Sequence, residues 1–122
     1  MRGLFVLVVE DDPDCAAVLS EALALADHGV AVANTAAEAR EQVARRVPDL
    51  AIVDGHLGGD AGLEVIRALR RGTFGNGPVI LATGMGRDEV EVEALAAGVN
   101  EILVKPIELS VLLDAVSRLG GR

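Results

Sequence analysis

The stretch LFVLVVEDDPD, residues 4–14, decides the fold because a run of apolar residues passes directly into a cluster of acids. The run Leu4–Val9 is too short for a helix and rich in β-branched residues, which predicts a buried strand. Asp12 followed by Pro13 is typical of a helix N-cap with proline at the first helical position. Two charges about 5 Å apart repel by roughly 3 kcal/mol at an effective dielectric near 20, so the acids are either splayed into water or held by positive charge.

The same alternation of short apolar runs and helical patterns continues along the chain. We expect strands at Leu4–Val9, Val30–Ala33, Leu50–Val53, Val79–Ala82 and Ile102–Val104. Five strands alternating with five helices predict right-handed crossovers and a parallel sheet covered on both faces. The strands are continuously apolar, which indicates the same three-layer, doubly wound α/β fold.

Helix faces and helix ends agree with this fold. One predicted buried stripe is made of Cys15, Val18, Leu19, Ala22 and Leu23, and another of Leu109, Leu112, Leu113, Val116 and Leu119. Thr35 and Glu38 have the spacing of a capping box. Gly29, Gly72 and Gly98 fall where helices should stop. We expect a single domain over residues 1–122, a length that leaves no room for a second one.

The charge pattern excludes several classes of partner. The formal charge of −8 repels nucleic acid and anionic membranes, and the chain has no Lys/Arg block. No apolar stretch approaches the eighteen or more residues that span a bilayer, so we expect a soluble cytoplasmic protein with neither direct nucleic-acid nor membrane partners. Cys15 is the single cysteine, which excludes an internal disulfide, and its position predicts a small core residue.

Polar residues follow the predicted strands where each strand ends. These segments are Glu10–Asp12, Asp54, Thr83–Gly84 and Lys105–Pro106. Ligands of such folds bind beyond the carboxyl ends of the strands, so we expect these residues to converge on one edge of the sheet. Several carboxylates in one crevice favour a hard divalent cation such as Mg²⁺. Lys105, the only lysine in the chain, then faces the acids, either as a functional group or as a plain salt bridge.

Together the four segments resemble the receiver domain of two-component response regulators, in order and spacing over essentially the whole chain. The matching pieces are Val8–Asp14, Pro48–Asp54, Ala82–Gly84 and Val104–Pro106. The resemblance implies a flavodoxin-like sheet of strand order 2-1-3-4-5. It also implies a phosphoacceptor signalling domain and no turnover enzyme, with phosphorylation and dephosphorylation as its only self-catalysed reactions.

The resemblance assigns a role to each site residue. Asp54 is the phosphoacceptor, and Lys105 and Thr83 contact phosphoryl oxygens. Asp11 is a direct ligand of Mg²⁺ or Mn²⁺, and Glu10 acts through water. The backbone carbonyl of His56 completes the metal site together with Asp54. The Lys105–Pro106 peptide bond is expected to be cis, which proline makes affordable.

The switch residues implied by the resemblance are Thr83, Gly84, Ile102 and Pro106. The family usually has an aromatic residue where this chain has Ile102, so its usual relay of the signal is in question. The segment Leu81–Gly86 is similar to the Phe-Ala-Thr-Gly signature of certain alphaproteobacterial single-domain receivers, which also lack that aromatic. Gly58-Gly59 replaces a common Pro-Gly and makes the loop more permissive.

The function implied is acceptance of a phosphoryl group on Asp54, with Mg²⁺, from a histidine kinase or a histidine phosphotransfer protein. The signal would leave through the face made by the fourth helix, the fifth strand and the fifth helix, toward an unknown downstream protein. A degenerate receiver that only binds partners is an alternative. An Mg²⁺-dependent aspartyl phosphohydrolase is another, although its Asp-x-Asp pattern is missing. A flavin or mononucleotide binder would need a phosphate-binding loop where this chain is acidic.

Overall fold

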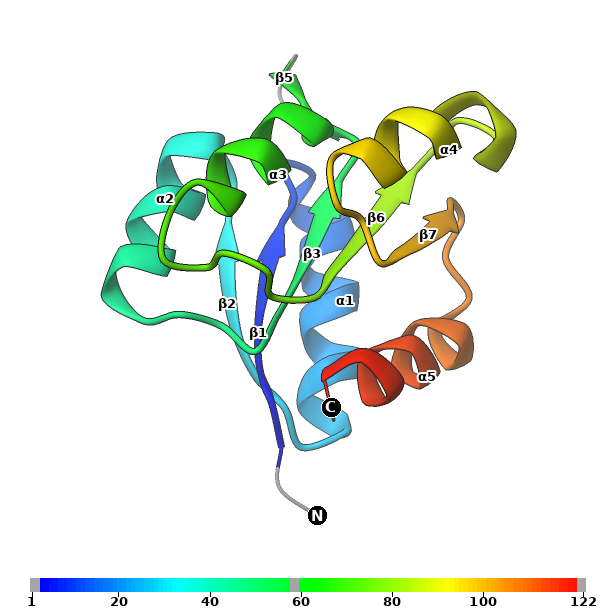
Figure 1. Ribbon diagram of the computed structural model, residues 1–122. Helices are drawn as coiled ribbons and strands as arrows, with labels where there is room; N and C mark the ends of the chain where they lie inside the picture. The colour runs from blue at the N-terminus through cyan, green and yellow to red at the C-terminus, as the bar shows by residue number, and fades with distance from the viewer. Residues whose placement is uncertain (1–2, 58–59, 121–122) are drawn as a thin grey trace.

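A five-stranded parallel sheet forms the centre of the protein (Figure 1). The computed structural model describes residues 3–57 and 60–120. The strand order is β2-β1-β3-β6-β7, and every neighbouring pair is parallel. Since β6 and β7 are the fourth and fifth strands of this sheet, the predicted order 2-1-3-4-5 is confirmed. The helices cover both faces, which confirms the three-layer α/β architecture.

The elements follow the predicted alternation closely. The strands of the main sheet are β1 (Phe5–Val9), β2 (Gly29–Ala33), β3 (Leu50–Asp54), β6 (Val79–Thr83) and β7 (Glu101–Val104). The helices are α1 (Pro13–Leu25), α2 (Ala36–Arg45), α3 (Gly62–Arg70), α4 (Arg87–Ala96) and α5 (Leu109–Gly120). Each strand of the sheet differs from its predicted range by at most one residue at either end.

Successive residues of the central strands point into two separate apolar cores. On β1, Val6 and Val8 face the core under α1 and α5, whereas Leu7 and Val9 face the core under α2, α3 and α4. This alternation is the two-residue period of a strand, and both faces are apolar because helices cover both. Figure 1 shows α1 and α5 on one side of the sheet and α2 and α3 on the other.

Both predicted helix N-caps are present. Asp12 accepts a hydrogen bond from the backbone N–H of Asp14 and caps α1. Thr35 accepts from the N–H of Glu38, and the Glu38 carboxylate reaches back to the N–H of Asn34, one residue before the cap. A capping box of this kind satisfies amides that the first turn leaves open.

Gly29 does not stop α1, contrary to the prediction. The helix ends at Leu25, and the residue with a left-handed backbone is Asp27, at φ 68°. Aspartate tolerates this conformation better than most residues, so no glycine is required there. Gly29 instead begins β2. Gly98, at φ 86°, does lie just beyond α4 as predicted.

Two residues of the predicted helix stripes are exposed. Val18 is 52 % exposed and Leu109 is 38 % exposed, while Ala16 and Ala115 take part in the core. The buried face of α1 is therefore turned slightly from the expected one, away from Val18 and toward Ala16. Among the described residues, no helix is both long enough and apolar enough to cross a lipid bilayer.

A small antiparallel pair that the sequence did not predict follows β3. It consists of β4 (His56–Leu57) and β5 (Asp60–Ala61), and it leads directly into α3. Strands of two residues leave no readable pattern in a sequence, which explains the omission. The expected effect of Gly58-Gly59 on this loop lies outside the described residues.

Candidate functional site

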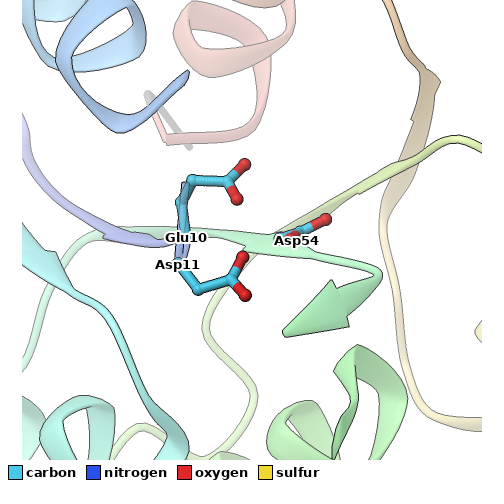
Figure 2. Close-up of side chains that lie close together, drawn as sticks. All are labelled: Glu10, Asp11 and Asp54. Carbon is cyan, nitrogen blue, oxygen red and sulfur yellow. The ribbon is translucent and has the colours of Figure 1, made fainter. Parts of the chain in front are cut away.

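The residues predicted to converge do lie at one edge of the sheet. Glu10 and Asp11 follow β1, Asp54 ends β3, Thr83 ends β6 and Lys105 follows β7. The strands are parallel and adjacent in the sheet, so their carboxyl ends bring these residues together. Figure 2 shows Glu10, Asp11 and Asp54 as a group of carboxylates at the ends of β1 and β3.

Three carboxylates form a compact cluster with the chemistry of a cation site. One oxygen each from Glu10, Asp11 and Asp54 lies within 4.8 Å of the others. Glu10 and Asp54 are buried, with 2 % and 7 % of their surface exposed, whereas Asp11 is exposed to solvent. Hard oxygen donors with access to water are what Mg²⁺ requires, since it keeps several of its waters when bound. The donor set therefore fits Mg²⁺ or Mn²⁺.

Lys105 supplies positive charge between two of these acids. Its Nζ lies 3.0 Å from Oδ1 of Asp54 and 3.1 Å from Oε1 of Glu10. Burial alone would lower the pKa of Lys105, but the hydrogen bonds and charges of Asp54 and Glu10 outweigh it and raise the pKa to about 12. The ammonium group is consequently charged across the physiological range. Lys105 therefore provides positive charge that offsets the repulsion between buried carboxylates at the ends of β1 and β3.

Glu10 is held by several donors. Besides Lys105, the backbone N–H of Asp12 donates to its Oε2 at 3.3 Å, and the Cys15 thiol donates to the same carboxylate. Burial would raise the pKa of Glu10, and these hydrogen bonds reverse the effect and hold the pKa below its usual value. Asn34 Nδ2 also donates to the backbone oxygen of Glu10 at 3.3 Å.

Cys15 was predicted only as a core residue, and its contact with Glu10 was missed. The residue packs partly against the apolar core below α1, as expected, but its thiol also reaches the site. Burial and the neighbouring Glu10 carboxylate raise the pKa of the thiol to about 11. The available signal was its place on the first turn of the helix that follows the acids.

Thr83 lies beside the acceptor strand with its hydroxyl engaged. Its Oγ1 accepts a hydrogen bond from the backbone N–H of Met85 at 3.0 Å, and the residue is 4 % exposed. Gly55, directly after Asp54, lets the two strands approach, since a Cβ there would stand 3.3 Å from Oγ1 of Thr83. The Thr83 hydroxyl therefore lies next to Gly55 and is hydrogen-bonded to the loop that follows β6.

The other predicted site and switch residues lie on β4, on β7 and in the loops after β6 and β7. The Lys105–Pro106 peptide bond is cis, as expected. His56 lies in β4, just beyond Asp54 and Gly55. Ile102 is buried in β7, 5 % exposed, and Gly84 lies in the exposed loop between Thr83 and α4.

Comparison with known proteins identifies the family. Residues 6–117 match the family model described as the response regulator receiver domain. The chain belongs to this family. As a receiver domain of the two-component response regulators it is a signalling domain, in a family that binds Mg²⁺ at an acidic site and interacts with histidine kinases or phosphotransfer proteins.

Curated relatives of the receiver are bacterial regulators. The phosphate regulon transcriptional regulatory protein PhoB of Pseudomonas aeruginosa is 30 % identical over 99 % of the chain and 55 % of its own length. The response regulator protein FleR of the same organism is 36 % identical over 93 % of the chain and 24 % of its own length. The chain thus spans about half, or about a quarter, of these relatives.

Solved structures of other receivers have the same fold. A putative response regulator from Chloroflexus aurantiacus superposes with a TM-score of 0.91 at 28 % identity, covering 99 % of this chain and 100 % of that one. The receiver domain of the sensor histidine kinase PA1611 from Pseudomonas aeruginosa has a TM-score of 0.88 at 25 % identity, with 99 % and 100 % covered. That structure has a magnesium ion coordinated in the active site cleft.

Proposed function

We propose that residues 1–122 form one receiver domain that accepts a phosphoryl group on Asp54 from a phosphohistidine donor. The observation that carries this is the placement of Asp54, whose carboxylate lies in the acidic cluster and 3.0 Å from the Lys105 ammonium. A carboxylate can act as nucleophile toward phosphorus only if the negative charge of the incoming group is neutralised. Family membership supports the same reaction.

The step transfers phosphorus from nitrogen to oxygen. A carboxylate oxygen of Asp54 forms a bond to phosphorus as the phosphorus–nitrogen bond of the donor breaks, and the donor imidazole keeps the electron pair. Lys105 turns from the carboxylates toward one phosphoryl oxygen, and the Thr83 hydroxyl donates to another. Attack of water on the same phosphorus later releases inorganic phosphate and restores Asp54, so the domain catalyses only its own modification and its reversal.

Glu10, Asp11 and Asp54, with the backbone carbonyl of His56, would hold Mg²⁺ in this proposal. When bound, the ion supplies neutralisation of charge on the transferring group. Asp11 is the exposed member of the cluster and suits direct coordination beside water, whereas buried Glu10 is tied to Lys105 and Asp12 and suits contact through water. The magnesium ion in the active site cleft of the PA1611 receiver supports the same site.

Intact-mass measurement after exposure to acetyl phosphate tests the assignment. The protein should gain one phosphoryl group with Mg²⁺ and none with excess chelator. Asp54→Asn should gain none, while Asp88→Asn, a change of an exposed acid on α4, should label as the unmodified chain does. Labelling of Asp54→Asn equal to that of the unmodified protein would reject Asp54. Steady turnover of small phosphate esters would favour the phosphohydrolase instead.

A groove beside the site is suited to the donor. It is lined from the site outward by Cys15, Val18, Lys105, Pro106, Ile107 and Leu109, and it continues past Val18 to Leu25 and Leu113. Its floor is apolar, and the acids Asp12, Asp14 and Glu21 line it as well. We propose that a donor helix with apolar residues and basic flanks docks there, in the cytoplasm, where response regulators generally act.

Charge reversal in the groove separates docking from chemistry. The phosphoryl donor is a phosphorylated histidine phosphotransfer protein, selected from a panel because it phosphorylates the unmodified chain. Val18→Glu should slow transfer from this donor by at least tenfold. Labelling by acetyl phosphate, which needs no docking, should stay within twofold. Equal slowing with both donors would place the effect in the site and reject the groove.

A further inference from the structure

Arg87, the first residue of α4, reaches across to the last strand of the sheet. Its Nη2 donates to the backbone carbonyl of Ile102 at 2.8 Å and lies 3.8 Å from Oε2 of Glu101. Within the described sheet β7 pairs only with β6, so it is an edge strand. Charged side chains over such an edge protect it from pairing with other chains, which is the simple structural role of this contact.

The position of Arg87 connects that contact to the phosphorylation site. The loop Gly84–Gly86 separates Arg87 from Thr83, and the Met85 N–H in this loop donates to the Thr83 hydroxyl. When the hydroxyl turns toward a phosphoryl group on Asp54, that bond is lost and the loop is released. Gly86 offers α4 no side-chain cap, and the first helical residue, Arg87, instead ties this end of the helix to β7.

A second arginine extends the contact to α5. The other carboxylate oxygen of Glu101 lies 3.4 Å from Nη2 of Arg118, whose Nε lies 3.3 Å from Asp114 on the same helix. Glu101 therefore stands between an arginine of α4 and an arginine of α5. Exposed ion pairs contribute little to stability singly, but this set joins three elements whose relative positions can then change together.

The contact involves the position where the family usually has an aromatic residue. Ile102 is buried, and its backbone carbonyl, not its side chain, is the acceptor for Arg87. A link through the backbone does not depend on which side chain stands at that position. It can consequently serve a receiver that has isoleucine there.

We propose that Arg87 couples the phosphoryl site to the surface formed by α4, β7 and α5, and that its bond to Ile102 belongs to the unphosphorylated form. The inference rests on the proposed function, because it needs phosphorylation of Asp54 to pull Thr83 away from Met85. A contact made in only one of two forms shifts their balance, so removing Arg87 should favour the phosphorylated arrangement.

Backbone amide NMR of the full chain, with and without excess acetyl phosphate and Mg²⁺, tests the coupling. In the unmodified protein we expect phosphorylation to shift amides of residues 84–86, 101–104 and 109–118. In Arg87→Ala the amides of residues 101–104 and 109–118 should already lie toward their phosphorylated positions, and their further response should fall at least threefold. The rate of labelling by acetyl phosphate should rise about two- to fivefold.

Two further variants make the result specific. Glu101→Gln removes the charge between the arginines but keeps the Arg87–Ile102 bond. It should reduce the response of residues 109–118 and leave that of 101–104. Because this change keeps the shape of the half-buried side chain, the variant tests the coupling even if Arg87→Ala does not fold. Arg71→Ala, a change of an exposed arginine beyond α3, is the matched control and should behave as the unmodified chain does.

The outcomes distinguish this inference from the proposed function. Normal labelling of Asp54 with equal responses of α5 in the unmodified protein, Arg87→Ala and Glu101→Gln would reject the coupling and leave the function intact. If Arg87→Ala makes the chain associate through β7 but leaves its response to phosphorylation unchanged, Arg87 only protects the edge strand. Failure of the unmodified chain to label at all would overturn the function and the coupling with it.

Discussion

Cys15 shows how one residue takes its chemistry from its surroundings. The thiol is partly exposed in the groove beside Lys105, so reagents can reach it. Its reactivity is set by the thiolate, and burial together with the Glu10 carboxylate disfavours that form. The same hydrogen bond stabilises the ionised Glu10 carboxylate. It therefore helps to lower the pKa of Glu10 and to raise that of Cys15.

We therefore predict slow alkylation of Cys15 in the folded protein. With the thiol pKa raised to about 11 from 9.0, the folded protein at pH 8 should react with iodoacetamide about a hundredfold more slowly than in urea. Mass spectrometry of timed samples gives both rates. Glu10→Gln removes the carboxylate and should speed the folded rate several-fold. Equal rates in the folded and unfolded chain would contradict a raised pKa of the thiol.

At the scale of elements, the start of α3 packs closely against the end of β3. Gly62 begins α3, and a Cβ there would stand 2.2 Å from the backbone oxygen of Asp54 and 2.8 Å from Cα of Gly55. Both neighbours are backbone and cannot move aside without displacing the acceptor. This packing fixes where β3 presents Asp54.

Gly62→Ala should consequently lower both stability and phosphorylation. Forcing a methyl group into such contact costs about 1–3 kcal/mol of the free energy of unfolding. Urea denaturation measures that loss, and acetyl phosphate labelling should slow severalfold because the carboxylate is displaced. Gly72→Ala is the control, since a Cβ there would meet only the backbone oxygen of Leu69, at an ordinary contact distance of 3.7 Å. Similar stability of both variants would show that the backbone near Asp54 yields easily.

Elements with strong local signals could be predicted from the sequence, whereas contacts between distant elements could not. The strands, the cap at Asp12 and the order of the sheet follow from apolar runs and turn chemistry. The predicted end of α1 is wrong because a left-handed residue after a helix is usually glycine, whereas here it is Asp27. The hydrogen bond from Arg87 to Ile102 depends on how α4 packs beside β7, which no local pattern records.

The candidate site shows the same division. Lys105 and the acids after β1 and β3 could be brought together because parallel strands align their carboxyl ends. Which acid the lysine contacts could not be predicted, and the structure gives it both Asp54 and Glu10. The contact of Cys15 with Glu10 was missed because its spacing on α1 resembles that of a core residue.

For the whole molecule, composition makes the response to alkali simple to interpret. The chain has no tyrosine, one lysine and one cysteine, so Lys105 and Cys15 are its side chains that titrate between about pH 9 and 12. Both have raised pKa values in the folded protein, about 12 against 10.5 for Lys105 and about 11 against 9.0 for Cys15. The folded state therefore holds protons that the unfolded chain has released.

The sign of the effect follows from this difference in bound protons. Stability falls with rising pH wherever the folded state binds more protons than the unfolded one. The contribution of Cys15 is complete below pH 9.0 and is lost as the pH rises through about 11. That of Lys105 is complete below 10.5 and is lost as the pH rises through about 12. Glu10, with its lowered pKa, acts on the acid side, and its contribution disappears as the pH falls below 4.5.

We predict that the free energy of unfolding, measured with urea in chelator at constant ionic strength, declines in two stages above pH 9. Cys15→Ser should remove the first stage and leave a decline that begins above pH 10.5. Lys105→Met should remove the second, and its deficit relative to the unmodified protein should shrink as the pH rises from 10.5 toward 12, where the unfolded lysine has lost its charge and the folded one is about half deprotonated. A deficit that stays constant from pH 8 to 12 would mean that Lys105 acts through packing of its chain, and that its ammonium is not what holds Asp54 and Glu10 together.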